Sequence, residues 1–245
     1  MAVTFFFVLG GFAMTLGYKD RVLSPDFGYK QFLTKRFIKF YPLHWLCIMA
    51  VMPLVAFSFS WKQIPILALN ATLLQTWIPI KGVYFSFNAV SWYLADTMFF
   101  AVIFPFIFKW IYYASPKGLA LIAAALLTVH VVVAISIPEE EYHAILYISP
   151  YMRLMDFMLG IFLALGYLKL KDKKTTKWNS KACQITTLGL IILLVIESCL
   201  LSENERLFAP VYWIPVALLI VIASQSERNG GGKFWKTNGY SILAS

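Results

Sequence analysis

Runs of about twenty apolar residues, separated by short stretches that hold most of the charge, constrain the fold of this chain more than any other feature. A transmembrane helix needs about 20 mostly apolar residues, with a range of about 17 to 25. Seven runs meet this requirement: Ala2–Tyr18, Phe37–Ser58, Val90–Tyr113, Gly118–Ile137, Pro150–Leu168, Ala182–Leu201 and Phe208–Ser224. The sequence therefore predicts an all-α, polytopic transmembrane helical bundle with about seven full spans.

The composition supports a membrane location and argues against two other classes of protein. Of the 245 residues, 60% are hydrophobic and 13% are charged, whereas a soluble domain has about 45–50% apolar and about 25% charged residues. A net charge of +9 would suit a nucleic-acid-binding protein, but the basic residues lie between apolar runs, with no basic soluble domain to carry them. The three cysteines lie within apolar runs, without the spacing of disulfides or a metal site: Cys47, Cys183 and Cys199. We therefore expect no nucleic-acid partner and no metal.

An eighth apolar segment, Ile64–Ile80, is short, has a proline near each end and contains four polar residues. The basic loops indicate whether it crosses, because lysine and arginine collect on the cytoplasmic side. If Ile64–Ile80 crossed the membrane, the six lysines of Lys169–Lys181 would face outward. If it does not cross, both Lys169–Lys181 and Arg228–Lys236 are cytoplasmic, and the acidic stretch Glu139–Glu141 is external. The second topology is the more consistent. It predicts that Ile64–Ile80 is re-entrant or lies at the outer interface. We expect it to cover a polar site, because irregular backbone inside the membrane is tolerated only where protein or a water-filled cavity surrounds it.

Arg36 and Lys39 precede the apolar part of the second run, and a spacing of three residues puts them on one helix face. One interpretation is that they, like Lys35, hold the orientation of the protein at the cytoplasmic surface, with their alkyl stems against apolar neighbours. The other interpretation is an anion site, in which two cations converge on a phosphorylated ligand from the cytoplasm.

Ionisable residues inside two other runs are candidates for function, because a charge within a transmembrane span is rare without one. Trp92 and Asp96 are four residues apart, and Arg153 and Asp156 are three apart, so each pair shares a helix face near the predicted outer end. Asp96 could instead reach the nearby interface, and Arg153 and Asp156 could form an ion pair that only holds the bundle together. We interpret His130 as a hydrogen-bonded packing residue.

A basic pair on the cytoplasmic side and acidic residues on the outer side of one bundle suit a protein that moves a group from a cytoplasmic donor to an external acceptor. Four motifs support this reading in order along the chain. They are FFFVLGGF (Phe5–Phe12), RFIKFYP (Arg36–Pro42), NAVSWYLAD (Asn88–Asp96) and RLMDFMLG (Arg153–Gly160). In order and spacing they resemble the acyltransferase-3 family of integral membrane O-acyltransferases, over nearly the whole chain.

The resemblance implies transfer of an acyl group, usually acetyl, from acyl-CoA to a hydroxyl of a surface polysaccharide, a lipopolysaccharide or an exported glycoside, in the bacterial inner membrane. Acyl-CoA would be a donor substrate, with no permanently bound cofactor. The basic pair would hold the CoA phosphates. The resemblance assigns the remaining motif residues as catalytic, namely Asp96, Arg153 and Asp156, or as substrate-binding, namely Asn88, Ser91 and Trp92.

The chain also departs from the family pattern. Gly10 replaces a serine, Lys39 an arginine, and Asp96 and Asp156 each a glutamate. The family's catalytic histidine is expected on a span before Phe5–Phe12, and two further spans are expected after the last run. We therefore predict that residues 1–245 are a single membrane acyltransferase domain truncated at both ends. This domain would be nearly inactive alone, since a general base typically contributes about 10²–10⁴-fold.

Two other functions remain open. A transporter or flippase of an anionic or sugar-linked substrate would need inverted repeats or paired broken helices, and the sequence shows one broken segment without a partner in the second half. A non-catalytic remnant or partner subunit would lack the upstream histidine span.

Overall fold

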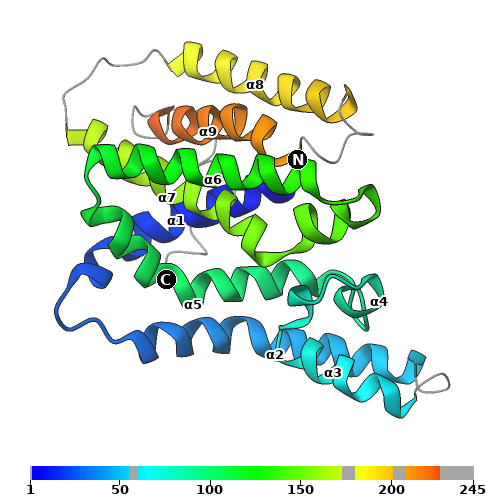
Figure 1. The fold of residues 1–245 in the computed structure, drawn as a ribbon. Helices are drawn as coiled ribbons and strands as arrows, with labels where there is room; N and C mark the ends of the chain where they lie inside the picture. Colours follow the sequence, from blue (N-terminus) through cyan, green and yellow to red (C-terminus); the bar gives the residue numbers. More distant parts are fainter. Residues whose placement is uncertain (1, 56–59, 173–179, 201–207, 227–245) are drawn as a thin grey trace.

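The computed structural model describes residues 2–55, 60–172, 180–200 and 208–226, and every regular element in this part is helical. In Figure 1 the long helices lie alongside one another as a bundle. They are α1 (Ala2–Leu23), α2 (Tyr29–Val55), α5 (Ser91–Tyr113), α6 (Pro116–Ser136), α7 (Pro150–Asp172), α8 (Ser180–Leu200) and α9 (Phe208–Ser226). The predicted all-α bundle is confirmed.

Five of these helices are long and apolar enough to cross a membrane, namely α1, α2, α5, α6 and α7. The two remaining predicted runs fall in α8 and α9, with Leu201 outside the described residues. Many large apolar side chains face outward, including Leu121 and Ile135 on α6, which are 71% and 74% exposed. A contiguous apolar surface of this kind needs a partner, and the lipid of a membrane provides one. The protein is an integral membrane protein.

Helix α1 lies in the middle of the bundle and packs closely against α7. Two glycines allow this approach. A Cβ atom added to Gly160 would collide with the carbonyl oxygen of Val8, and one added to Gly11 would collide with the carbonyl oxygen of Phe157. Small residues let transmembrane helices pack backbone against backbone. This contact positions Thr4 of α1 next to the polar residues of α7.

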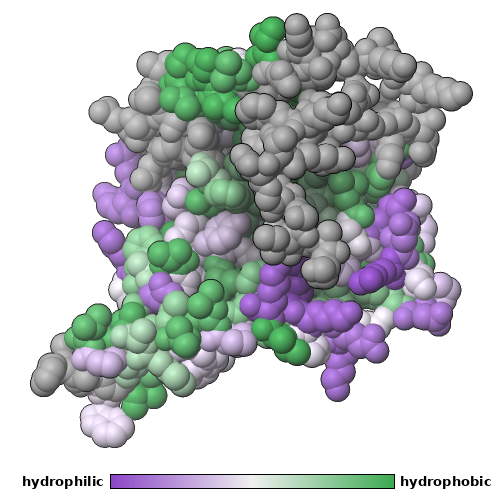
Figure 2. Space-filling model, turned by 180° about the vertical axis from the view of Figure 1, so that it is seen from behind, coloured by the Kyte–Doolittle hydropathy of each residue, from purple (hydrophilic) through white to green (hydrophobic). Residues whose placement is uncertain are grey.

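The two ends of the bundle differ in charge. At one end, the left in Figure 1, α1 and α7 finish while α2 and α6 begin. Lys19 and Lys169 line a cavity of about 580 Å³ there, and Arg21 and Lys35 line a second one of about 230 Å³. Figure 2 views the molecule from behind, and hydrophilic surface is concentrated on the right, at this same end. The opposite end carries Glu139–Glu141.

This asymmetry agrees with the predicted topology, in which the cation-rich end faces the cytoplasm. Residues 173–179 of the lysine-rich loop and all of residues 228–236 lie outside the described part of the chain. The side that each end faces therefore stays a prediction.

The segment between α2 and α5 is broken. It contains α3 (Ile64–Ala71), a 3-10 turn (Gln75–Trp77) and α4 (Lys81–Tyr84), and the backbone of Leu73 is left-handed, with φ of 59°. Eight residues of helix extend about 12 Å, too short for a hydrocarbon core of about 30 Å. The segment is therefore not a spanning helix, as predicted. It also covers polar groups: three of its side chains are at most 2% exposed, namely Asn70, Gln75 and Thr76.

Candidate functional site

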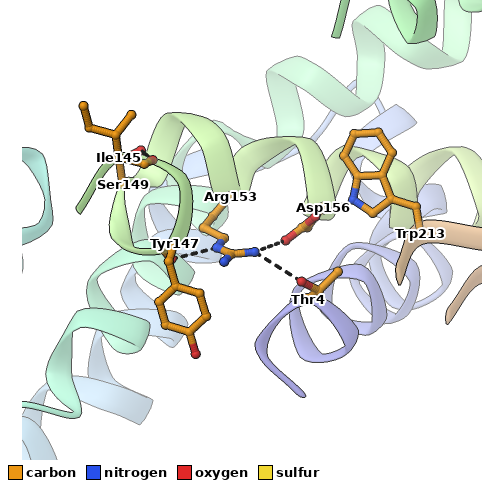
Figure 3. A network of polar contacts seen from close by, with 7 residues as sticks. All are labelled: Thr4, Ile145, Tyr147, Ser149, Arg153, Asp156 and Trp213. Carbon is orange, nitrogen blue, oxygen red and sulfur yellow. Dashed lines mark hydrogen bonds and ion pairs between the residues drawn. The ribbon is translucent and has the colours of Figure 1, made fainter. Parts of the chain in front are cut away.

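Arg153 is the centre of a buried polar network, drawn in Figure 3. Its side chain is 1% exposed. Nε donates a hydrogen bond of 2.7 Å to the carbonyl oxygen of Tyr147, and Nη1 donates to Thr4 Oγ1 at 3.2 Å and to Asp156 Oδ2 at 2.9 Å. The short π-helix His143–Ile148 ends just before Pro150 starts α7, which leaves the Tyr147 carbonyl free to accept. A π-helical turn is rare and often marks a functional site.

Asp156 connects this network to a third helix. Its side chain is fully buried, and Oδ1 accepts a hydrogen bond of 2.6 Å from Trp213 Nε1 on α9. Helices α1, α7 and α9 therefore all hold the ion pair with Arg153, which is 2.9 Å long. A buried ion pair is tolerated only when further hydrogen bonds satisfy both partners, and here they do.

Aromatic rings line one side of the network. The Tyr147 ring centroid lies 4.7 Å from the Arg153 guanidinium carbon and 5.3 Å from the Trp92 ring. Trp92 is 8% exposed. The predicted substrate residue Trp92 is thus part of the wall of the site.

Asp96 approaches the same region from α5. It is fully buried, so it does not reach the aqueous interface, and that alternative is wrong. The Thr76 hydroxyl lies beside its carboxylate, and Arg153 is close enough for its charge to act on it. Neither carboxylate oxygen makes a hydrogen bond of normal geometry with a described residue. Asp96 therefore lies in the same region as Arg153 and Asp156, and the catalytic roles of all three stay predictions.

A second network fixes the broken segment over α5. Asn70 Nδ2 donates to the Ser86 hydroxyl at 2.9 Å, and Ser91 Oγ donates to Asn70 Oδ1 at 3.3 Å. Gln75 Nε2 donates to Ser91 Oγ at 3.1 Å, and His44 Nε2 lies 2.9 Å from the Asn70 carbonyl oxygen. Ser91 therefore lies in the site region as predicted, whereas Ser86 has no signal in the sequence.

Asn88 has a different place from the one predicted. Its Oδ1 accepts from the backbone N–H of Val90 at 3.3 Å, and its carbonyl oxygen accepts from Ser91 Oγ at 2.6 Å. It thus shapes the turn that starts α5. A direct contact between Asn88 and a substrate stays a prediction without support from this geometry.

Arg36 and Lys39 also differ from each other. The Arg36 guanidinium carbon lies 4.9 Å from the Tyr18 ring centroid and 5.6 Å from that of Phe32. Both rings line the smaller cavity at the cation-rich end, together with Arg21 and Lys35. Arg36 therefore packs against two of the rings that line this cavity, although it is not itself a lining residue.

Lys39 is exposed and lies over the Phe40 ring, and neither it nor Arg36 is among the residues that line the cavity. The convergence of Arg36 and Lys39 on one anion stays a prediction. Arg21 is a cavity residue that the motif analysis missed.

A model of the acyltransferase-3 family, described as an acyltransferase domain, matches residues 1–242. The chain belongs to the acyltransferase-3 family. Among characterised proteins, the chain is similar to "Acyltransferase MdmB" of Streptomyces mycarofaciens, with 28% identity over 184 residues. That alignment covers 67% of this chain and 46% of the relative, so the chain matches less than half of the relative's length. No solved structure matches.

The family motifs map onto the two regions of this acyltransferase-3 chain. The second motif begins at Arg36, beside the cavity of the cation-rich end. The third and fourth motifs carry Asp96 and Arg153 to the buried polar centre. His130 packs against Trp213, with ring centroids 6.0 Å apart, but neither of its nitrogens has a hydrogen-bond partner among the described residues. The interpretation of His130 as a packing residue fits, whereas its hydrogen bond is not found.

Proposed function

We propose that the full-length protein is a membrane O-acyltransferase that moves an acyl group, most simply acetyl, from acyl-CoA to a hydroxyl of a cell-surface or exported carbohydrate. The observation that carries this proposal is the separation of two sites within one bundle. A cation-lined cavity lies at one end, and a buried centre with two carboxylates and a guanidinium lies toward the other. The family and the relative's name support the class of reaction.

The cation-rich cavity suits the phosphates of CoA. Arg21 and Lys35 line it together with one acidic residue, Asp26, and the Arg36 guanidinium lies against the Tyr18 and Phe32 rings of its wall. Hydrogen bonds to charged groups are worth about 1.5–3 kcal/mol each. The excess of positive charge around the cavity would therefore favour a ligand that carries several phosphate charges.

The buried centre suits the acceptor and the reacting atoms. Attack of a hydroxyl on a thioester releases a proton and builds negative charge on the carbonyl oxygen before the thiolate leaves. A fixed cation such as Arg153 stabilises that charge in surroundings that exclude water. The carboxylate of Asp96 can accept a hydrogen bond from the attacking hydroxyl.

We place the protein in the bacterial inner membrane, with the cation-rich end in the cytoplasm, where acyl-CoA is made. In this proposal the bilayer, acyl-CoA and the carbohydrate acceptor are the partners of the protein. The thioester end of acyl-CoA extends from the cytoplasmic end to the polar centre, where the acceptor hydroxyl attacks it and the CoA thiolate leaves toward the cytoplasm.

Replacing Arg36 by glutamine in the full-length protein should weaken the binding of acetyl-CoA about 10- to 100-fold, because one charge-assisted contact is lost. Titration of acetyl-CoA into the purified protein in nanodiscs measures this directly. Lys39→Gln is the matched control and should change the affinity only a few-fold, since exposed Lys39 lies over the Phe40 ring and not over the rings that line the cavity.

If the Arg36→Gln variant binds acetyl-CoA with the affinity of the parent protein, the proposed donor site is wrong. Uptake of labelled acetyl-CoA into vesicles without transfer of the label would instead favour the transporter alternative.

A further inference from the structure

We propose that the buried oxygens of Asp96, Thr76 and Gln75 bind a ligand with at least two hydroxyl groups, and that Thr76 and Gln75 determine its specificity. The inference rests on the proposed function, since that ligand is the acceptor of the acyl group. It adds two residues that lie outside the family motifs, on the broken segment between α2 and α5.

Gln75 and Thr76 both face α5 because the broken segment is fixed in place. The left-handed backbone at Leu73 ends α3 and turns the chain so that the next residues face α5. Gln75 is held by its bond to Ser91, and Thr76 lies beside Asp96. Gln75 and Asp96 are fully buried and Thr76 is 2% exposed.

Four oxygen atoms of this group have no hydrogen-bond partner of normal geometry among the described residues: Gln75 Oε1, Thr76 Oγ1 and both carboxylate oxygens of Asp96. Gln75 Nε2 donates a hydrogen bond to Ser91 Oγ, so Gln75 Oε1 is the atom of this amide that can accept a hydrogen bond from a ligand. Buried polar atoms are almost always paired, and each unpaired one costs free energy. These acceptors are therefore available to a donor that the described residues do not supply.

The chemistry of these atoms selects the class of ligand. An anion is disfavoured because the group presents acceptors and a carboxylate. A metal cation is disfavoured because the charge of Arg153 acts on Asp96. A hydroxyl group both donates and accepts, so it can bond to a carboxylate, an amide oxygen and a threonine hydroxyl. Several acceptors close together fit adjacent hydroxyls, as a sugar ring carries.

The test uses membranes that contain the full-length protein, labelled acetyl-CoA and the carbohydrates of the host membrane as acceptors. Thr76→Val keeps the shape and removes the hydroxyl, and it should lower transfer to the carbohydrate fraction about fivefold to tenfold. Thr76→Ser should retain most of the transfer. The melting temperature should not change, because the lost hydroxyl has no hydrogen bond of normal geometry to a described residue.

Thr97→Val is the matched control. Thr97 directly follows Asp96 in the chain, but its hydroxyl already donates to the Tyr93 carbonyl oxygen at 2.8 Å. The control should transfer acetyl at the parent rate, and both valine variants should bind acetyl-CoA normally.

Three results would overturn the inference while the proposed function stands. Thr76→Val could transfer acetyl at the parent rate, it could lose affinity for acetyl-CoA instead, or Thr97→Val could lose as much transfer as Thr76→Val. A further control replaces sodium chloride by choline chloride. If this replacement lowers acetyl transfer by the parent protein to the rate of Thr76→Val, the site binds a cation, and the inference is overturned. Absence of transfer by the parent protein would instead reject the proposed function, and the acceptor site with it.

Discussion

Replacement of Arg153 by methionine is expected to lower the free energy of unfolding by about 3–5 kcal/mol and to abolish acyl transfer. The variant leaves the Asp156 carboxylate buried without its ionic partner, and loss of one partner of a buried ion pair typically costs this much. The Tyr147 carbonyl and the Thr4 hydroxyl also lose their donor. Thermal unfolding in detergent and transfer of labelled acetyl in membranes measure the two effects.

A double variant, Arg153→Met with Asp156→Leu, separates a catalytic role from a structural one. Replacement of both members of a buried ion pair by apolar residues is often neutral or stabilising, so the double variant should unfold at a higher temperature than the single one. Transfer should stay absent, because the cation and the carboxylate are both gone. Recovery of transfer in the double variant would show that the pair only holds the bundle together.

Replacement of Gly160 by valine should prevent the close contact between α1 and α7 and lower the free energy of unfolding by about 3 kcal/mol or more. Overpacking usually costs about 1–3 kcal/mol, and here the obstacle is the carbonyl oxygen of Val8, which is backbone and cannot rotate away. Gly166→Ala on the same helix is the control, because a Cβ atom there meets nothing within 4 Å. The amount of inserted protein and its melting temperature give the comparison. Normal stability of Gly160→Val would contradict the described contact.

Much of the architecture follows from patterns that are local in the sequence. The apolar runs predicted the long helices, and the prolines and polar residues of Ile64–Ile80 indicated that this segment does not cross. Asp96, Arg153 and Asp156 could be selected because charges inside apolar runs are costly and therefore rare. Spacings of three and four residues correctly predicted which of them share a helix face.

The partners of these residues could not be predicted, because periodicity gives the face of a helix and not the helix that it meets. Thr4 lies 149 residues before Arg153, and Trp213 lies 57 residues after Asp156. Nothing in either local sequence indicates the contact. The same limit applies to Arg36, since one of the two rings that it lies against, Tyr18, belongs to α1.

The most direct test of the account supplies acetyl-CoA to one side of the membrane at a time. Everted inner-membrane vesicles that contain the full-length protein expose the predicted cytoplasmic end to added labelled acetyl-CoA, whereas right-side-out vesicles do not. The account predicts alkali-labile label on the carbohydrate fraction in everted vesicles only, and its loss in Arg36→Gln. Equal labelling in right-side-out vesicles, or labelled carbohydrate with Arg36→Gln at the parent level, would contradict it.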